Sequence, residues 1–537
     1  MRLLLVLSLS FVVATTAASA QPSQVAPTPG EALFVVSGRG WGHGVGMSQY
    51  GAYGMANAGY AYDEILANYY TGTELGRAGT KQLRVLLAEG RRAITVTSTA
   101  PYVAVDAAGT RFPLPRGPLA LTQKLVVPTE KGPARAVPPL VIRPGKGPSL
   151  SLDGRPYRGQ LELASERGFL RVVNIVPLES YLQGVVAGEV PHSWPSEALK
   201  AQAVAARSYA LATRVEGKPF DLYSDVRSQV YLGIAGEKPS TTAAVRATAG
   251  QVVLYGGEIA TTYYFSTSGG KTASAADVFG FSVPYLVSRP DPWDKASPYH
   301  RWGPILIGAR TVQSKLGVAS RVLDATGVPT PSGRLRSLRL QTAAGQTSVP
   351  ASLLRTALGL RSTWISVGVL RLDQQRGAVV FGSTVRLAGI ARGLPSPVLS
   401  SSPDGSASTW SVVGPLQRDS NGTFSLPLTP TRTARYRIEV EGASSPALLV
   451  QVAPRVQLRQ AATADTLAGI VRPRLKGAEV TVERRQGTSW EQLAETRVDA
   501  DGSFSAELAL VPGSYRARVA KTGTWAEGVT PVLEVTG

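Results

Sequence analysis

The sequence contains no cysteine. This absence excludes disulfide bonds, thiolate metal ligands, a cysteine nucleophile and the lipidated cysteine of a lipoprotein anchor. Histidine is scarce as well, with three residues in 537. His43 has no neighbouring ligand, and His192 and His300 are single histidines, so a catalytic zinc site is not expected.

Long apolar runs are also missing from most of the chain. After the first twenty residues no stretch approaches the ~18 consecutive apolar residues of a transmembrane helix. The first twenty themselves carry Arg2, a largely apolar run from Leu3 to Val13, and Ala18-Ser19-Ala20. This is the pattern of a cleaved signal peptide. We therefore expect residues 1–20 to direct export, and the mature chain to work in the periplasm or cell wall.

Acidic residues are fewer than basic ones, at 37 Asp and Glu against 56 Lys and Arg, for a formal net charge of +19. Outside the cell this favours anionic wall polymers or a membrane surface as partners rather than nucleic acid. General solubility in an arginine-rich proteome explains the charge equally well. The length predicts roughly three domains of ordinary globular composition.

The C-terminal part of the sequence repeats itself with a period of 80 residues. The recurring segments are Leu387–Ile390 with Leu467–Ile470, Trp410 with Trp490, and Asn421–Phe424 with Asp501–Phe504. Alternating strands and Asn-Gly or Asp-Gly turns predict two small β-sandwich modules, at 377–456 and 457–537. Neither contains a cluster of catalytic residue types, so we interpret them as spacers or wall-binding modules.

The preceding part mixes strands and helix, which predicts the α+β class. Residues 81–176 are strand-rich, with "LRVLLA", "AITVTS" and "FLRVVNIV" as the clearest strands, and 128–148 looks like a loop excursion. The one long helical stretch is 193–214, where Ser193 can cap the helix and Pro195 fits its first turn.

A carboxyl group stands just ahead of that helix, in "YLQGVVAGEVPHSWP". Glu189 follows an apolar, strand-like run, so we expect it at a strand end among apolar neighbours, where burial raises a carboxyl pKa toward neutrality. On the helix, Lys200 and Arg207 share one face two turns apart. The alternative is a surface glutamate beside a solvated charged face.

Four blocks of this sequence resemble the SpoIID/LytB family of bacterial cell-wall proteins. The first is "YLQGVVAGEVPHSWPSEALKAQAVAARSYAL"; the others are "YYFSTSGGKTASAADVFG" (263–280), "LRTALGLRSTWISV" (354–367) and "GRGWGHGVGMSQYGAYGMA" with "YAYDEILANYYTGTEL" (within 34–75). The resemblance covers roughly residues 34–367. It predicts a domain at 21–376, with the strand-rich part at 81–176 and the remaining core blocks at 177–367.

The "GHGVGMSQ" block closes the domain in the family pattern but comes first here, so the chain resembles a circular permutant whose closing element, 34–75, has moved to the front. Glycines at every second position from Gly38 to Gly46 predict a strand with one bare face that presses against neighbouring backbone. The spacing is not that of a dinucleotide-binding loop, and no Lys-Ser/Thr follows as in a P-loop.

The resemblance implies a function and a set of site residues. Some members cleave peptidoglycan glycan strands as lytic transglycosylases, and others modify a wall amidase. By motif, Glu189 matches the catalytic acid/base, and the implied substrate-binding residues are Lys200, Arg207, Tyr264, Ser266, Ser268, Gly269 and Gly270, with His43 and Gln49 from the opening block. Zinc-holding members use Cys and His near a Gln-Val-Tyr element, and "DLYSDVRSQVY" offers neither. We expect no metal and no cofactor.

A single glutamate suits this reaction, because a hydrolase normally needs two carboxyls. A lytic transglycosylase needs no attacking water, since the muramyl 6-hydroxyl closes on its own anomeric carbon. Asp225 and Asp277 are the candidates for a second carboxyl. Two other hypotheses stay open: a non-catalytic wall-binding or amidase-modifying protein, and a structural surface protein that displays its β modules. Whether the glycan must be stripped of stem peptides is also open.

Overall fold

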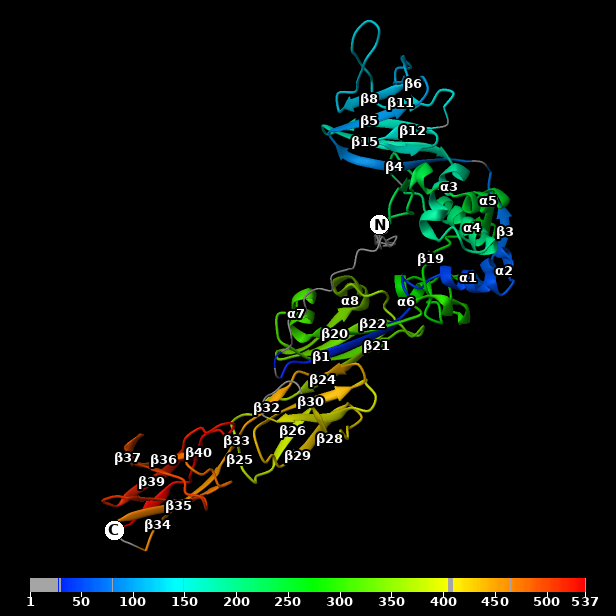
Figure 1. Cartoon of the computed structure of the whole chain (residues 1–537). Coiled ribbons are helices and arrows are strands. Elements are labelled where there is room, and N and C mark those ends of the chain that lie inside the picture. Colours follow the sequence, from blue (N-terminus) through cyan, green and yellow to red (C-terminus); the bar gives the residue numbers. More distant parts are fainter. Residues whose placement is uncertain are drawn as a thin grey trace.

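The computed structural model describes Thr28 and residues 30–536, apart from residues 80, 148, 216, 404–408 and 463–464. The predicted signal peptide, residues 1–20, lies outside the described residues. Strands account for 44% of the chain and helices for 17%, and most helices gather in one region, which agrees with the expected α+β class. Figure 1 shows an elongated molecule with a strand-rich lobe at one end and the second repeat at the other.

The strand-rich lobe contains two sheets, as expected for residues 81–176. The larger sheet has the order β16 (Leu222–Tyr223), β4 (Gln82–Arg91), β15 (Phe169–Pro177), β14 (Gln160–Glu166), β11 (Leu140–Arg143), β6 (Tyr102–Val105) and β7 (Arg111–Leu114). The smaller has the order β13 (Arg155–Tyr157), β12 (Leu150–Leu152), β5 (Ala93–Ser98) and β8 (Gly117–Thr122). Residues 128–148 are not purely a loop, because β11 and the short β10 (Ala134–Arg135), paired with β9 (Val126–Val127), fall partly or wholly there.

The helical lobe shares one apolar core with the strand-rich lobe. Its helices are α1 (Gln49–Asn57), α2 (Tyr62–Tyr69), α3 (Leu178–Glu189), α4 (Ser196–Ala212) and α5 (Pro239–Ala247), beside a small sheet of β18 (Glu258–Ile259), β17 (Gln251–Tyr255) and β3 (Glu74–Arg77). The predicted long helix is confirmed as α4, but Pro195 occupies its N-cap, so the capping role expected of Ser193 is wrong.

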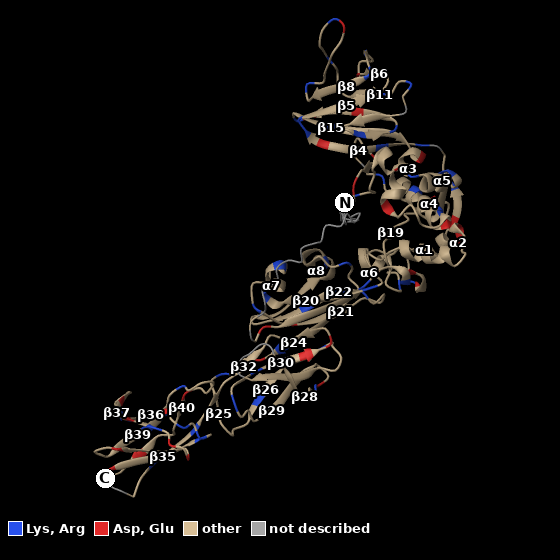
Figure 2. Ribbon diagram, in the orientation of Figure 1, with Lys and Arg blue, Asp and Glu red and all other residues tan. Residues whose placement is uncertain are grey.

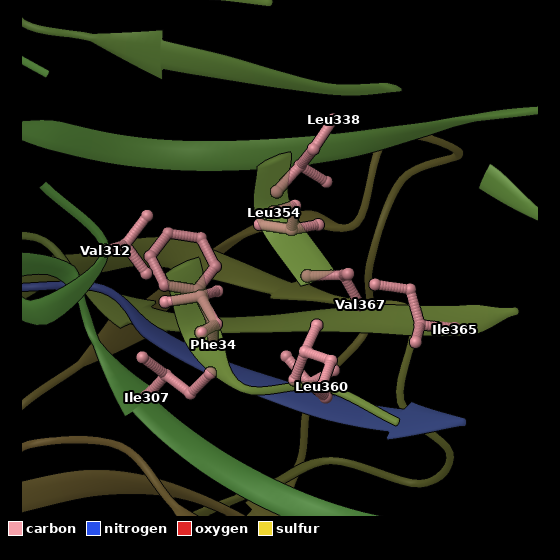
Figure 3. A pocket seen from close by; sticks show the side chains of 10 residues that line it. Phe34, Ile307, Val312, Leu338, Leu354, Leu360, Ile365 and Val367 are labelled. Carbon is pink, nitrogen blue, oxygen red and sulfur yellow. The ribbon is translucent and has the colours of Figure 1, made fainter. Parts of the chain in front are cut away.

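The middle lobe is built around β1 (Leu33–Arg39), which pairs antiparallel with β20 (Arg301–Gly308) on one side and β24 (Ile365–Leu372) on the other. A three-stranded meander of β21 (Val322–Pro329), β22 (Leu335–Thr342) and β23 (Gly345–Pro350) completes it with α7 (Ala309–Leu316) and α8 (Ala351–Leu358). Figure 3 shows a small apolar pocket here, lined by Phe34, Leu354, Ile365 and similar side chains. Because no polar side chain lines this pocket, we interpret it as a packing gap in the apolar core.

The first repeat is continuous with the middle lobe. One sheet runs β20-β1-β24-β26-β29, where β26 is Val385–Arg392 and β29 is Thr423–Leu428. The sheet opposite it holds β28 (Ser411–Pro415), β27 (Val398–Pro403), β30 (Ala434–Val440), β31 (Ala443–Ser444) and β32 (Leu448–Val450). Leu33 and Val35 of β1 pack into the core between them. The boundary expected at 376 therefore falls between two paired strands, β24 and β26.

The second repeat has a core of its own. One sheet contains β34 (Arg455–Gln460), β35 (Thr466–Arg472) and β38 (Ser503–Glu507); the other contains β37 (Ser489–Arg497), β36 (Glu479–Gln486), β39 (Gly513–Val519), β40 (Gly528–Val529) and β41 (Leu533–Val535). A short pair, β25 (Val379–Val380) with β33 (Val452–Ala453), lies between the repeats. The first strand of the second repeat, β34, pairs with β35. The equivalent pair in the first repeat is β24 with β26, so the structural unit of the first repeat begins at β24.

Lys and Arg occur in every lobe, and Figure 2 shows their positions spread along the whole molecule. The excess positive charge is therefore not gathered on one element. Within the part of the chain that the structure describes, no helix is long and apolar enough to cross a membrane.

Candidate active site

Glu189 is the last residue of α3, and it is buried, with 4% of its surface exposed. The prediction that it ends a strand is wrong. Its apolar neighbours in sequence form a helical stripe, and that stripe packs into the core: Leu178, Tyr181, Leu182, Val185 and Val186. The expected burial of the carboxyl is nevertheless confirmed.

Burial raises the pKa of Glu189 to about 7, outweighing the hydrogen bonds from Val230 and Tyr264, which lower the pKa. The backbone N–H of Val230 donates to Glu189 Oε1 at 3.2 Å. A carboxyl with this pKa is protonated in about half of the molecules near neutral pH. Glu189 can therefore both donate and accept a proton.

The polar side chains around Glu189 are uncharged and linked to one another. Gln229 stands between two tyrosines: Tyr181 donates its hydroxyl to Gln229 Oε1 at 3.1 Å, and Gln229 Nε2 donates to the Tyr264 hydroxyl at 2.9 Å. Burial raises the pKa of both tyrosines, and the nearby Glu189 charge raises it further. The network keeps the carboxyl in a polar but neutral surrounding.

Gln49, the first residue of α1, reaches the same place from the other end of the sequence. Its Nε2 donates to the backbone carbonyl of Glu189 at 3.3 Å and lies 3.4 Å from Gln202 Oε1. Ser48 fixes the start of α1, because its hydroxyl accepts from the Gly51 N–H at 3.1 Å. The structure thus brings the predicted residues Gln49 and Glu189 together.

The glycine-rich segment is not the regular strand that the sequence predicts. Strand β1 ends at Arg39, and Gly40, Gly42, Gly44 and Gly46 all have positive φ. Close backbone approach, however, is confirmed: a Cβ on Gly46 would stand 2.1 Å from the carbonyl oxygen of Tyr263. Side-chain-bearing residues cannot follow this path without strain.

This segment lies where the permutation hypothesis places it. Trp41 bridges Thr267, Val45 bridges Ala273, and the two-residue strands β2 (Met47–Ser48) and β19 (Tyr264–Phe265) pair in parallel. The Arg39 N–H also donates to the Trp364 carbonyl at 2.9 Å, which brings in the block at 354–367. The contacts are confirmed; the permutation itself, a statement about the order of elements in relatives, stays a prediction.

His43 is a structural residue in this arrangement rather than the substrate contact that was expected. Its Nδ1 accepts from the Val45 N–H at 3.0 Å, and its Nε2 lies 3.1 Å from the Tyr264 carbonyl. Burial, with the charges of Arg355 and Arg334, lowers the pKa of His43 to about 3. The neutral ring has both nitrogens occupied and holds Tyr264 in place.

Arg207 is fully buried, which contradicts its expected role in touching substrate. Its guanidinium makes a bidentate pair with Glu179, at 2.8 and 2.7 Å, and also donates to the carbonyls of Gln251 and Val245. These contacts tie α4 to the start of α3, to α5 and to the first residue of β17. Lys200, two turns earlier on α4, is partly exposed and pairs with Glu197 at 2.6 Å, so the two cations share a helix side but do not form one exposed basic face.

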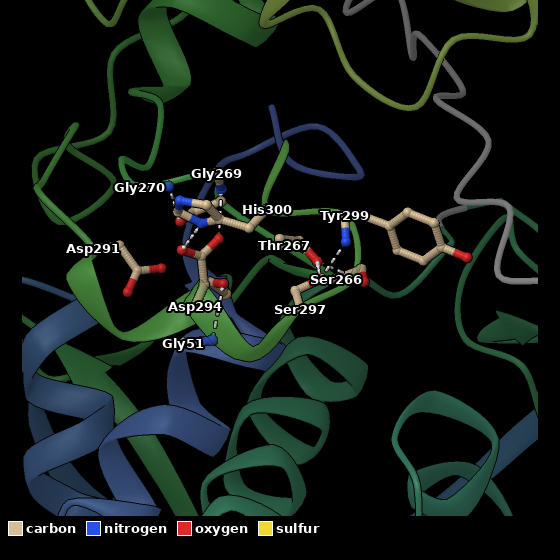
Figure 4. Close-up of polar contacts among 12 residues, drawn as sticks. Gly51, Ser266, Thr267, Gly269, Gly270, Asp291, Asp294, Ser297, Tyr299 and His300 are labelled. Atoms are coloured by element: carbon tan, nitrogen blue, oxygen red, sulfur yellow. Dashed lines mark hydrogen bonds and ion pairs between the residues drawn. The ribbon is translucent and has the colours of Figure 1, made fainter. Parts of the chain in front are cut away.

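The predicted block at Ser266, Ser268, Gly269 and Gly270 forms a loop that is buried except at Gly270 and follows Tyr264 in sequence. Figure 4 shows Gly269 and Gly270 beside Asp294 and His300. Ser266 accepts from the Tyr50 N–H through its carbonyl at 3.0 Å, and Ser268 Oγ accepts from the Gly270 N–H at 3.0 Å. The Gly269 N–H donates to Asp294 Oδ2 at 2.6 Å. The loop is held by polar contacts on both sides.

Sequence reasoning missed the acidic pair that supports this loop. Asp294 is buried, and its Oδ1 lies 2.8 Å from His300 Nδ1. Asp291 accepts from the Tyr69 hydroxyl at 3.0 Å, and burial, followed by the charge of Asp294, raises its pKa to about 6. The only signal was the "DPWDKASPYH" stretch, in which two acids and a histidine stand close together.

The two candidates for a second carboxyl are engaged elsewhere. Asp225 pairs with Arg227 at 2.7 Å, and hydrogen bonds from that arginine lower its pKa. Asp277 accepts hydrogen bonds from the backbone and hydroxyl of Ser332. Among the described residues, neither carboxylate is hydrogen-bonded to Glu189 or to the network of Gln229. The residues described here also contain no group of three His, Asp or Glu side chains arranged for a metal ion.

The comparison with protein families decides how the part that carries Glu189 is classified. Residues 166–255 match the family model for Stage II sporulation protein, SpoIID. This part of the chain is similar to SpoIID, and we call it the SpoIID segment. The SpoIID segment contains Glu189, Lys200, Arg207 and Gln229, whereas Gln49 and Tyr264 lie outside it. The resemblance to the SpoIID family is confirmed over residues 166–255 and stays a prediction for the blocks outside them.

Three relatives match part of the sequence. Stage II sporulation protein D of Bacillus subtilis is 36% identical over 163 residues, and the amidase enhancer of the same organism is 40% identical over 147. Each alignment takes in 27% of this chain, and covers 47% and 20% of those relatives. An uncharacterized protein of Brachyspira hyodysenteriae is 40% identical over 139 residues, covering 25% of this chain and 38% of the relative. The chain thus spans less than half of each of these relatives.

Proposed function

We propose that this protein is a cell-wall protein that binds peptidoglycan glycan strands and cleaves them without water, as a lytic transglycosylase. The observation that carries the proposal is the state of Glu189: a buried carboxyl, with a pKa of about 7, among uncharged hydrogen-bonding side chains. The SpoIID segment and the names of its relatives support a role in the cell wall.

The proposed reaction uses one carboxyl twice. Protonated Glu189 gives its proton to the glycosidic oxygen as the bond from that oxygen to the muramyl C1 breaks. The muramyl C6 hydroxyl oxygen then bonds to C1, and its proton passes to the Glu189 carboxylate. Glu189 is protonated again at the end, so no water is consumed and the product carries a 1,6-anhydro-muramic acid end.

The residues around Glu189 have separate tasks in this proposal. Gln229 and Tyr264 keep the carboxyl oriented through their hydrogen bonds, and Gln49 holds the end of α3 in place. Lys200, which is partly exposed, stays a proposed substrate contact. Arg207 acts through the fold, because its contacts position α3 rather than a ligand.

The low exposure of the Glu189 carboxyl favours a second candidate function. Glu189 is 4% exposed, and Gln49 and Tyr264 are buried beside it, so a sugar must open the site to reach the carboxyl. A protein that holds glycan without cutting it, and thereby modifies a wall amidase, does not need that opening. One relative is named as an amidase enhancer.

Purified peptidoglycan distinguishes the two candidates. The full-length protein is incubated with it, and soluble fragments and bound protein are both measured, for wild type, Glu189→Gln and Glu258→Gln. Glu258 is an exposed glutamate on β18 and serves as the matched control. We expect fragments from wild type and Glu258→Gln only, with binding by all three. Binding by all three without any fragments would favour the non-catalytic function.

A further inference from the structure

Five partly exposed aromatic side chains lie near the end of α3, in two groups. In the first, the ring of Trp194 is 5.1 Å from that of Tyr50 and 5.0 Å from that of Tyr53. In the second, Trp41 and Tyr299 meet edge to face, with their centroids 4.5 Å apart. Aromatic rings that gather at the surface often mark a binding site, so two such groups of partly exposed rings in one region need an explanation.

The two groups are connected through the backbone of Ser266 and Thr267, which directly follow β19. The Tyr50 N–H donates to the Ser266 carbonyl, and the Thr267 N–H donates to the Trp41 carbonyl, both at 3.0 Å. Ser297 Oγ lies 2.7 Å from Thr267 Oγ1 and accepts from the Tyr299 N–H at 3.1 Å. The groups are therefore neighbours along one short piece of backbone.

The side chains of the two groups are also close in space. Burial raises the pKa of Tyr50, and the nearby hydroxyls of Tyr299 and Tyr53 raise it further. Figure 4 shows the Tyr299 ring projecting away from the hydrogen-bonded side chains of Asp294 and His300. We call Tyr50, Tyr53, Trp194, Trp41 and Tyr299 the aromatic track.

The track begins beside the end of α3, the helix that carries the proposed catalytic Glu189. Tyr50 directly follows Gln49, whose amide contacts the Glu189 carbonyl at 3.3 Å. Trp194 stands in the short connection from α3 to α4, five residues after Glu189. A chain-like ligand that passes Glu189 can therefore continue over these rings.

Arg361 supplies a polar group at the far part of the track. Its guanidinium lies 4.6 Å from the Tyr299 ring centroid and 5.8 Å from that of Trp41. Its Nε is buried without a hydrogen-bond partner, and no acidic side chain of the described residues forms an ion pair with Arg361. A fixed donor without an acceptor is costly unless a ligand supplies one.

We propose that the aromatic track binds successive sugar rings of an N-acylated glycan, and that Arg361 donates to an N-acyl carbonyl oxygen of one of them. Aromatic rings present large apolar faces at low entropic cost, which suits the C–H faces of pyranose rings, while a few placed polar groups give specificity. This inference rests on the proposed function, because it takes the glycan as the ligand and identifies the residues that hold it.

Calorimetric titration of the full-length protein with chitohexaose, which is N-acetylated, and cellohexaose, which is not, tests both parts. Tyr299→Ala and Trp194→Ala should each weaken chitohexaose binding by about tenfold, the loss of one stacked ring. Arg361→Gln should mainly remove the preference for chitohexaose over cellohexaose. Tyr255→Ala is the control, because Tyr255, the last residue of β17, is an exposed aromatic residue whose ring contacts Tyr285 and none of the five rings of the track.

Tryptophan fluorescence provides a second measurement that does not depend on the alanine variants folding. Chitohexaose should change the emission of wild type, and Trp194→Phe, which keeps an aromatic ring, should lose part of that change while still binding.

Unchanged affinities in the track variants, or no binding of chitohexaose by a protein that cleaves peptidoglycan, would overturn this inference and leave the proposed function standing. A protein that neither binds nor cleaves peptidoglycan would overturn both.

Discussion

The side-chain amide of Gln49 donates to the backbone carbonyl of Glu189 at 3.3 Å, although 140 residues separate the two in sequence. This contact joins the glycine-rich segment to the SpoIID segment. Because Gln49 begins α1 and Glu189 ends α3, it also fixes two helix ends against each other. The candidate site is therefore assembled from both segments, and changes in either should alter it.

Gly46 tests the close approach on which this assembly depends. Gly46→Ala should lower the free energy of unfolding by at least ~3 kcal/mol, since its Cβ would overlap the Tyr263 carbonyl oxygen as well as strain a φ of +77°. Gly59 has a similar φ, +92°, with no atom within 4 Å of an added Cβ. Gly59→Ala should therefore cost only about 1 kcal/mol. Urea denaturation measures both; equal costs would contradict the packing described.

The raised pKa of Glu189 makes a prediction about stability. Its pKa is about 7 in the fold against 4.5 for an unperturbed glutamate, so the folded state loses stability as pH rises from 4.5 through 7. Glu189→Gln has no charge to bury. Its free energy of unfolding should match wild type near pH 4 and exceed it by on the order of 2–3 kcal/mol at pH 8. A difference that does not change with pH would mean that the carboxyl is not buried as described.

Arg207 should matter for stability more than for binding. Arg207→Ala leaves Glu179 and two backbone carbonyls without their partner, and should lower the free energy of unfolding by about 2–4 kcal/mol. Lys200→Ala removes a partly exposed ion pair and should cost less than about 1 kcal/mol. Denaturation curves and peptidoglycan binding are measured for both at a temperature where both are folded. A folded Arg207→Ala that has lost binding would restore the role expected from sequence.

Truncation before the first repeat and truncation before the second repeat should have different effects on folding. A chain that ends after Arg376 loses β26 and exposes Leu33 and Val35 of β1, so it should aggregate or melt well below the full-length protein. A chain that ends after Pro454 loses only the second repeat, which has its own core, and should stay folded. Size-exclusion chromatography and thermal melting distinguish the two. A stable, monomeric 376-residue chain would show that the shared sheet is dispensable.

The sequence predicted the location of the site better than its internal structure. The motifs identified Glu189, and the apolar run before it indicated burial. The same run has helical spacing, but its valines and glycines suggested a strand. The four consecutive apolar residues of β1, Leu33 to Val36, are typical of a strand buried on both faces. The sequence does not show which apolar cores the two faces of β1 pack into, because the strands that pair with β1 lie more than 250 residues away.

Burial of charged groups could not be predicted from local sequence. Arg207 is buried because Glu179, 28 residues earlier, folds back against it, and no spacing rule links the two. The supporting role of Asp291 and Asp294 could not be predicted either, because it depends on the fold placing the loop at Gly269 against Asp294. The aromatic track likewise combines rings from three separate regions of the chain.

The central claim is that Glu189 acts alone and that no water enters the reaction. Digestion of purified peptidoglycan in ¹⁸O-labelled water, followed by mass spectrometry, tests it most directly. We predict fragments that end in 1,6-anhydro-muramic acid and carry no ¹⁸O, and no fragments from Glu189→Gln. Fragments from wild type with ¹⁸O at a reducing muramic acid end would contradict the claim, because they would show that water attacks and that a second carboxyl takes part.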